Sequence, residues 1–267
     1  MNTKLTAAQI ESYNENGFVV IDDFLGADEL RTWRETVADT VASAGTEDQA
    51  HSVYATKRND PVFIQRFNMW FHHEGLRDLL LNPAIGKMAA TLAGVEGMRL
   101  YTDQALSKPP WGNPTAWHID DPHYSFYSRQ GLNLWLALDD ATVENGCMYF
   151  LPGTHKRASF NVELSAGATR DDIAELFTLR PEWKSIEAVA APMKAGSCSC
   201  HNGLVAHAAG PNMTPYPRRA MTILFMPDGS TFNGRKGYFS ESYVATKKIG
   251  DVLDDEEVTP LVYPLRS

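Results

Sequence analysis

The spacing of apolar residues changes at Gly97, and this change limits the folds open to the chain. Before it, apolar residues recur at helical spacing over about residues 27–43 and 75–93, with an interruption at Pro83. After it, short apolar runs are separated by Gly, Pro, Asn and Asp, which is typical of strands joined by turns. Helices followed by many short strands predict a mainly β protein, a sandwich or jelly roll with its helices packed on one sheet.

Weaker signals indicate the remaining elements. Thr6-Ala7-Ala8-Gln9 has the spacing of a capping box, so we expect a short helix to begin there. An apolar run over 18–21 predicts a strand, residues 45–62 are expected to form a loop, and residues 63–71 are ambiguous. Further strands are expected at 98–107, 116–119, 131–138, 147–151, 197–201, 205–208 and 220–226, with a helical insert at 171–179.

Nothing in the sequence marks a domain boundary, because the chain shows no internal repeat, linker or low-complexity segment. A β protein of 267 residues is often a single domain. We therefore predict one domain over residues 1–267. Its 1–95 part is expected to be mostly helical, its 96–230 part to be the jelly-roll core, and its 231–267 part to be a C-terminal lid or tail.

Charge and composition exclude several classes of partner. The net charge of −9 argues against nucleic acid, which needs a basic face. The sequence shows neither a signal peptide nor an apolar stretch long enough to span a membrane, so we predict a cytoplasmic protein whose partner is a small molecule. Three cysteines without a framework predict reduced thiols, and Cys198 and Cys200 are expected to point together into a core.

Candidate metal ligands begin with His118-Ile119-Asp120. Two imidazoles and one carboxylate can bind one face of Fe(II) and leave the other positions open. Alone the tripeptide is weak evidence, because eight His and eighteen Asp give roughly 0.5 chance matches in a chain of this length. If it lies in a strand, however, His118 and Asp120 project to the same face and can bind one ion.

The second imidazole has two candidates, His201 and His207, which are separated by the turn dipeptide Asn202-Gly203. We expect His207 and Arg218 to lie on neighbouring strands. A buried arginine requires an anion, and its guanidinium can pair with a carboxylate through two hydrogen bonds. Strand alternation places Arg218 and Arg219 on opposite faces without showing which of them points inward.

Taken in order, these and other motifs resemble the phytanoyl-CoA dioxygenase family of Fe(II)/2-oxoglutarate oxygenases. The resemblance covers roughly residues 6 to 226 and implies a double-stranded β-helix, the cupin-like jelly roll, with N-terminal helices on the major sheet. The motifs that carry it are Gly17-Phe18-Val19-Val20-Ile21, Lys108-Pro109-Pro110, Trp117-His118-Ile119-Asp120, Trp135 to Asp140, Glu144 to Met148, Pro152-Gly153-Thr154-His155 and His207 to Asn212 with Arg218.

The resemblance also implies roles for single residues. His118, Asp120 and His207 match the catalytic iron ligands of the family, and Arg218 matches the arginine that binds the distal carboxylate of 2-oxoglutarate. Two further matches are the pocket aromatic Trp135 and the polar contact Gln104. The family usually has a hydroxyl at the position of Ala209, so one hydrogen bond to 2-oxoglutarate, worth about 1 kcal/mol, is missing here.

The function implied is a dioxygenase that uses Fe(II), 2-oxoglutarate and O₂. It would hydroxylate an unactivated C–H bond of a small organic molecule, a specialised metabolite or a modified amino acid, and release succinate and CO₂. Related halogenases have Gly or Ala where this chain has Asp120, which favours hydroxylation. Two alternatives remain open: a zinc-dependent jelly-roll hydrolase, and a non-catalytic module that binds small molecules.

Aromatic and polar residues close to the metal motif are the candidates for substrate contact. They are Trp111, His123, Tyr124, Phe126 and Asn133. Phe232, Arg235 and Tyr238 are candidates for a C-terminal lid.

Overall fold

The structure, a computed structural model, describes residues 1–43, 64–160 and 173–264. Two antiparallel sheets form a sandwich, with strand order β1-β8-β5-β10-β3-β11 in the larger sheet, where β2 also pairs with β3, and β4-β9-β6-β7 in the smaller one. The strands are β1 (Phe18–Ile21), β2 (Ile64–Phe67), β3 (Met98–Lys108), β4 (Thr115–His118), β5 (Leu132–Ala137), β6 (Met148–Phe150), β7 (Val189–Ala191), β8 (Cys198–Asn202), β9 (His207–Ala209), β10 (Arg218–Pro227) and β11 (Leu261–Tyr263). The predicted jelly roll is confirmed.

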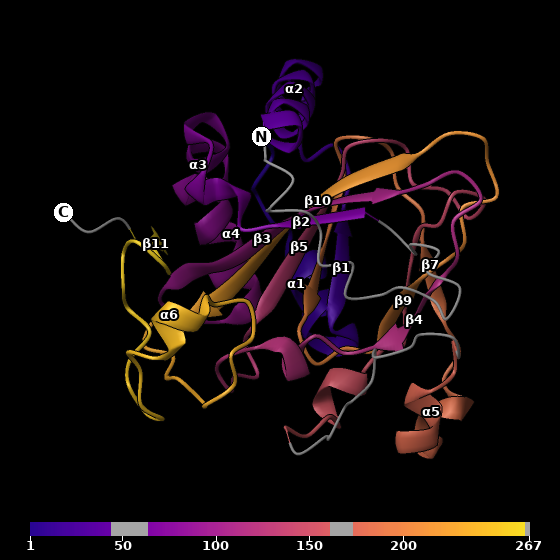
Figure 1. Cartoon of the computed structure of the whole chain (residues 1–267). Helices are drawn as coiled ribbons and strands as arrows, with labels where there is room; N and C mark the ends of the chain where they lie inside the picture. The colour runs from indigo at the N-terminus through magenta and orange to yellow at the C-terminus, as the bar shows by residue number, and fades with distance from the viewer. Residues whose placement is uncertain (44–63, 161–172, 265–267) are drawn as a thin grey trace.

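Helices cover the outer face of the larger sheet (Figure 1). The side chains of α1, α2, α3 and α4 share one core with outward-facing residues of β5, β8 and β10, among them Leu134, Cys200 and Ile223. Both cysteines of β8 are wholly buried there as free thiols, as expected. The helices are α1 (Ala7–Asn16), α2 (Ala27–Ser43), α3 (Glu74–Leu80), α4 (Pro83–Ala93), α5 (Leu176–Leu179) and α6 (Glu241–Val244).

Local signals fixed the ends of the first helices. The Thr6 side chain accepts a hydrogen bond from Gln9 N, and the Thr6 backbone N–H donates to Oε1 of the Gln9 side chain, so the predicted capping box is present. Gly17 ends α1 in the left-handed conformation that glycine adopts without strain. Pro83 begins α4 at its first turn, where its missing N–H costs no hydrogen bond.

The larger sheet extends beyond the predicted core range. β1 was predicted as a strand, within the part expected to be mostly helical, and it pairs with β8. β2 and β11 come from the segments expected to be ambiguous or a tail, and both pair with β3. Short edge strands of this kind carry little periodicity, which is why pattern reasoning understates them. The helical insert was expected at 171–179, of which 171 and 172 lie outside the described residues; in the described part of it, α5 covers Leu176–Leu179. The loop predicted at 45–62 lies outside the described residues.

The space between the two sheets is the part of the fold that matters for function. Its inner surface is lined by alternate residues of β3, β5, β8 and β10 on one side and by β4, β6 and β9 on the other. Figure 1 shows β4, β7 and β9 on one side of the larger sheet and α3 and α4 on the opposite side. Among the described residues, no helix is long and apolar enough to cross a membrane.

Candidate active site

Three side chains converge at the open edge of the sandwich. Oδ1 of Asp120 lies 3.7 Å from Nε2 of His118 and 3.6 Å from Nε2 of His207. These atoms all lie within 4.8 Å of one another, and within the described part of the chain no other group of His, Cys, Asp and Glu residues meets that condition. Two imidazoles and a carboxylate in this arrangement fit an Fe(II) ion with open positions.

The backbone explains how residues distant in sequence meet. His118 ends β4 and His207 begins β9, and the two residues are directly paired across these strands. Asp120 does not lie on the strand, so the expectation that strand alternation would align it with His118 was wrong. The chain turns after His118, because the backbone N–H groups of Asp120 and Asp121 both donate to Gly203 O, at 2.9 and 3.0 Å. That turn brings the carboxylate back to the imidazoles.

Backbone carbonyls fix the orientation of both imidazoles. Nδ1 of His118 lies 2.8 Å from Ala116 O, and Nδ1 of His207 lies 3.0 Å from Val205 O. A carbonyl only accepts hydrogen bonds, so each ring carries its proton on Nδ1 and presents the bare lone pair of Nε2 toward Asp120. This is the tautomer that a metal ion requires of a histidine ligand.

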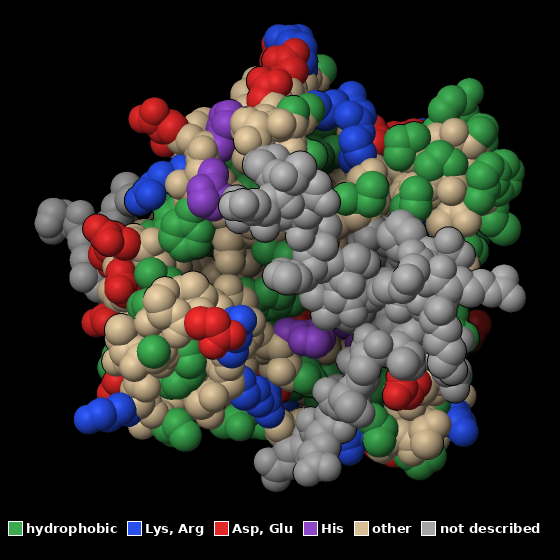
Figure 2. Space-filling model, viewed as in Figure 1, with side chains coloured by type: hydrophobic (Ala, Val, Ile, Leu, Met, Phe, Trp, Pro, Cys, Tyr) green, Lys and Arg blue, Asp and Glu red, His purple; other side chains and the backbone are tan. Residues whose placement is uncertain are grey.

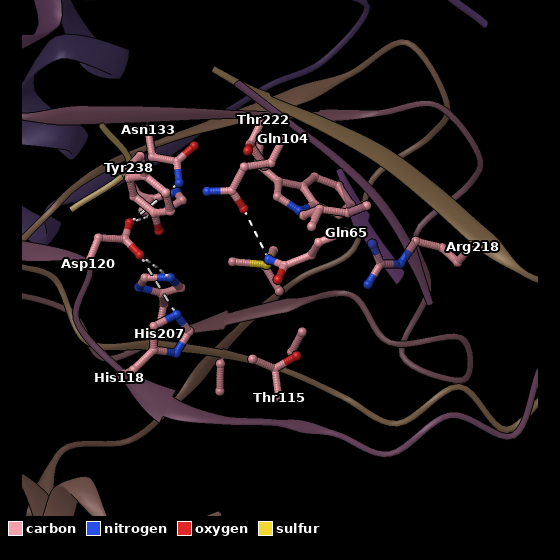
Figure 3. Close-up of a pocket in the computed structure, with 16 residues that line it drawn as sticks. Gln65, Gln104, Thr115, His118, Asp120, Asn133, His207, Arg218, Thr222 and Tyr238 are labelled. Carbon is pink, nitrogen blue, oxygen red and sulfur yellow. Dashed lines mark hydrogen bonds and ion pairs between the residues drawn. The ribbon is translucent and has the colours of Figure 1, made fainter. Parts of the chain in front are cut away.

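The other carboxylate oxygen of Asp120 faces the larger sheet. Its Oδ2 lies 3.4 Å from Nδ2 of Asn133 and 3.3 Å from Nε2 of His201 (Figure 3 draws the Asn133 contact). Burial acts to raise the pKa of Asp120, but the neighbouring His207, His201 and His118 outweigh it and hold that pKa well below its usual range. The group is therefore a carboxylate throughout the ordinary pH range.

Arg218 lies at the far end of the same pocket (Figure 3). Its side chain is buried, donates to Gly146 O at 3.0 Å and lies 5.0 Å from the centroid of the Trp135 ring. Burial lowers its pKa to about 10, so the guanidinium keeps its charge near neutral pH. Its Nε has no hydrogen-bond partner among the described residues. A buried cation with an unpaired donor fits a carboxylate ligand.

The structure decides between the two adjacent arginines. Arg219 points outward and forms a two-point ion pair with Asp139, with both N–O distances 2.8 Å. The expectation that His207 and Arg218 lie on neighbouring strands was wrong. They belong to β9 of the smaller sheet and β10 of the larger sheet, and they face the pocket from opposite sheets.

A single pocket extends between these two ends. Figure 2 shows histidine side chains at the centre of this face, in a hollow between the surrounding side chains. Side chains form a row across the larger sheet inside the pocket. Thr222 of β10 is paired with Gln104 of β3 on one side and with Trp135 of β5 on the other. Sixteen residues line it: Gln65, Gln104, Leu106, Thr115, His118, Asp120, Asn133, Trp135, Met148, His201, His207, Ala208, Ala209, Arg218, Thr222 and Tyr238.

Of the predicted substrate residues, Asn133 lines the pocket. Tyr124 and Phe126 do not, because they are buried in a separate aromatic cluster around Tyr101. Trp111 is 69% exposed and His123 is also outside the lining. An aromatic run after a metal motif has the same appearance in a sequence whether it packs inward or covers a site, and here it packs.

Of the three residues predicted to form a C-terminal lid, one lines the pocket and two do not. Tyr238 lines the pocket, whereas Phe232 is buried in the aromatic cluster. Asn233 holds the segment down, with its N donating to Ser125 O at 2.9 Å and its Nδ2 to Tyr124 O at 3.1 Å. Arg235 lies 3.5 Å from the carboxylate of Asp121 and outside the pocket lining. The segment therefore contributes one wall of the pocket.

Sequence reasoning missed Gln65, Thr222 and Thr115 as pocket residues. Gln65 comes from the ambiguous stretch, and its Nε2 donates to Oε1 of Gln104 at 3.1 Å. Thr222 is an ordinary strand residue in the sequence, and the pairing of β10 with β3 and β5 places it beside Gln104 and Trp135 in the pocket. An alternation count over β10 anchored on Arg218 would have found it, because both residues are even-numbered.

Ala209 lines the Arg218 side of the pocket, opposite Thr115 of β4. If 2-oxoglutarate binds there, Ala209→Ser should restore a hydrogen bond worth about 1 kcal/mol, which tightens its dissociation constant about 5-fold. Anaerobic calorimetry of 2-oxoglutarate binding to the metal-loaded variant tests this. An unchanged constant for Ala209→Ser relative to wild type would place 2-oxoglutarate elsewhere.

Comparison with known proteins agrees with this geometry. The family model "Phytanoyl-CoA dioxygenase (PhyH)" matches residues 13–220. The chain belongs to the phytanoyl-CoA dioxygenase family. A methylphosphonate hydroxylase of Gimesia maris is 30% identical over 93% of this chain and 88% of its own length. The dioxygenase lolE1 of Epichloe uncinata is 26% identical, over 90% of each chain.

Solved structures of similar proteins share the fold. The non-haem α-ketoglutarate-dependent carbocyclase SnoK from nogalamycin biosynthesis is 27% identical, with a TM-score of 0.81 over 97% of this chain and 96% of that one. EvdO2 of Micromonospora carbonacea var. aurantiaca, solved with 2-oxoglutarate, is 28% identical, with a TM-score of 0.60 over 84% of this chain and 91% of its own. The family, the fold and the donor set make this chain an iron- and 2-oxoglutarate-dependent dioxygenase, so the predicted class is confirmed.

Proposed function

We propose that His118, Asp120 and His207 bind Fe(II), and that Arg218 binds the distal carboxylate of 2-oxoglutarate in the same pocket. One observation carries this assignment: the two ends of a single pocket carry complementary groups. Three ligand atoms converge at one end, and a buried, charged, incompletely paired guanidinium lies at the other. Iron with 2-oxoglutarate and O₂ supplies oxidation of a substrate C–H bond and yields succinate and CO₂.

The residues of the chain have separate tasks in this proposal. The imidazoles and the carboxylate hold the ion by one face, and Arg218 fixes the direction in which the co-substrate lies. Trp135, whose ring lies against the guanidinium, and Leu106 exclude water from this end. Gln104 lies between the two ends, where its amide can contact either the co-substrate or the substrate (Figure 3).

We propose a small polar substrate, of the size of a specialised metabolite or a modified amino acid, and hydroxylation as its reaction. Gln65 Oε1, Asn133 Oδ1 and Thr222 Oγ1 are buried without hydrogen-bond partners among the described residues. Buried amide and hydroxyl groups of this kind require polar groups on a ligand. A purely hydrocarbon substrate would leave all three unpaired.

A zinc hydrolase is the alternative for the same three ligands, but it gives Arg218 no task. The two readings are separated by loading the metal-free protein with Fe(II) or Zn(II) and measuring 2-oxoglutarate consumption and succinate formation. The substrate panel contains methylphosphonate, amino-acid-like solutes and an acyl-CoA thioester. We expect succinate formation with Fe(II) and not with Zn(II). We also expect methylphosphonate or an amino-acid-like solute to increase the rate of succinate formation. Ester or amide hydrolysis with Zn(II), without succinate under any condition, would refute the proposal.

A further inference from the structure

His201 is a buried histidine at the metal site that the proposed ligand set does not use. Its side chain is wholly buried on β8, directly opposite Asn133 of β5. Its ring lies 4.5 Å from the ring of His207, centroid to centroid. Neither of its nitrogens completes a hydrogen bond with the described residues, although Nε2 lies 3.3 Å from Oδ2 of Asp120. Burying an imidazole in this way is costly unless it interacts with the site.

His201 carries its ring proton on a different nitrogen from His118 and His207. His118 and His207 donate Nδ1–H to backbone carbonyls and turn a bare Nε2 toward the site. Among the residues that the structure describes, His201 has no carbonyl partner at Nδ1, and its Nε2 faces a carboxylate oxygen, which only accepts. A neutral ring therefore carries its proton on Nε2 and presents a donor, so His201 is not arranged as a metal ligand.

The two oxygens of Asp120 consequently face different partners. Oδ1 faces the Nε2 atoms of His118 and His207, whereas Oδ2 faces His201 and Asn133. The two side chains that face Oδ2, His201 and Asn133, come from adjacent strands of the larger sheet and are paired across them. Asp120 itself lies in a turn after β4, where the backbone alone does not fix the side-chain rotation.

We propose that His201 is a positioning residue that holds Asp120 Oδ2, so that the carboxylate binds the ion through Oδ1 alone. A carboxylate free to rotate could bind through both oxygens and occupy a position that the co-substrate or O₂ needs. Outer partners of metal ligands typically contribute about 10- to 100-fold to metal affinity. This inference rests on the proposed metal site and adds a residue to it.

The test is titration of metal-free protein with Co²⁺ under anaerobic conditions, following its visible absorption, which reports both affinity and coordination number. His201→Leu should weaken Co²⁺ binding by about 10- to 100-fold and shift the visible bands toward a higher coordination number. His201→Gln, whose amide N–H reaches the position of Nε2, should restore affinity and spectrum to near wild type. If the leucine variant fails to fold, His201→Asn, whose shorter amide cannot reach, should show the same loss.

Ser199→Ala is the matched control. Ser199 lies two residues earlier on β8, points to the same face and is equally buried, but it does not line the pocket. The Ser199→Ala variant should bind Co²⁺ with the affinity and the spectrum of the wild type. Equal affinity and spectra for His201→Leu and wild type would overturn the positioning role. A loss that His201→Gln does not restore would make His201 a fourth ligand and also overturn it. Failure of the wild type to bind Co²⁺ would refute the metal site itself.

Discussion

Replacing Arg218 with methionine should weaken 2-oxoglutarate binding by at least about 30-fold, because removing one partner of a buried charge pair costs about 2–5 kcal/mol. The guanidinium is buried, remains charged near neutral pH and has no partner at Nε within the described part of the chain. Methionine keeps much of the side-chain volume, so the pocket should not collapse. Calorimetry of 2-oxoglutarate binding to the metal-loaded protein, without O₂, measures the change directly.

The adjacent residue provides the control for this experiment. Arg219→Met removes an equally charged side chain that is paired with Asp139 at the surface, so 2-oxoglutarate affinity should stay within about 2-fold of wild type. Arg218→Lys should fall between wild type and Arg218→Met, because lysine keeps the charge but loses the two-point geometry. Equal losses of 2-oxoglutarate affinity in Arg218→Met and Arg219→Met would show that the affinity depends on overall positive charge and not on a specific pairing with Arg218.

Replacing Asp120 with alanine should reduce the affinity for Fe(II) by more than about 100-fold, because even outer partners of metal ligands contribute about 10- to 100-fold. The substitution removes Oδ1, the one oxygen that lies close to Nε2 of both His118 and His207. Metal analysis after anaerobic loading and dialysis measures the retained iron, and succinate formation should be lost with it.

Asp121→Asn controls for the loss of an acidic side chain in the same turn. Asp121 is also buried, but it pairs with Arg235, away from the imidazoles, and burial raises its pKa to about 6. This variant should retain iron. Retention of iron by Asp120→Ala at the level of wild type would contradict the assignment of the ligands.

The order of the elements could be predicted from the sequence because helical and strand periodicities are local. Capping at Thr6, the stop at Gly17 and the proline at the start of α4 each act over a few residues, and the structure confirms them. The edge strands β2 and β11 depend on a partner that is distant in sequence, and their own residues carry too little pattern to show it.

The site could be predicted where a short motif contains the ligand residues themselves. It could not be predicted where the position of a side chain depends on contacts between distant segments. Alternation along β10 could not show whether Arg218 or Arg219 points inward, since the pairing of Arg219 with Asp139 and the burial of Arg218 exist only in three dimensions. The meeting of Asp120 with the two histidines was anticipated, but its position after the strand was not, because the turn that places it depends on Gly203 from a distant loop. The polar wall formed by Gln65 and Thr222 depends in the same way on sheet register.

One binding experiment tests the central claim that a metal ion and Arg218 hold the two ends of a single 2-oxoglutarate molecule. The dissociation constants of 2-oxoglutarate and of glutarate, which keeps both carboxylates but lacks the keto oxygen, are measured on metal-free and Fe(II)-loaded protein without O₂. We predict that Fe(II) strengthens 2-oxoglutarate binding strongly and glutarate binding only slightly. Equal affinity of 2-oxoglutarate for the metal-free and the loaded protein would contradict the account.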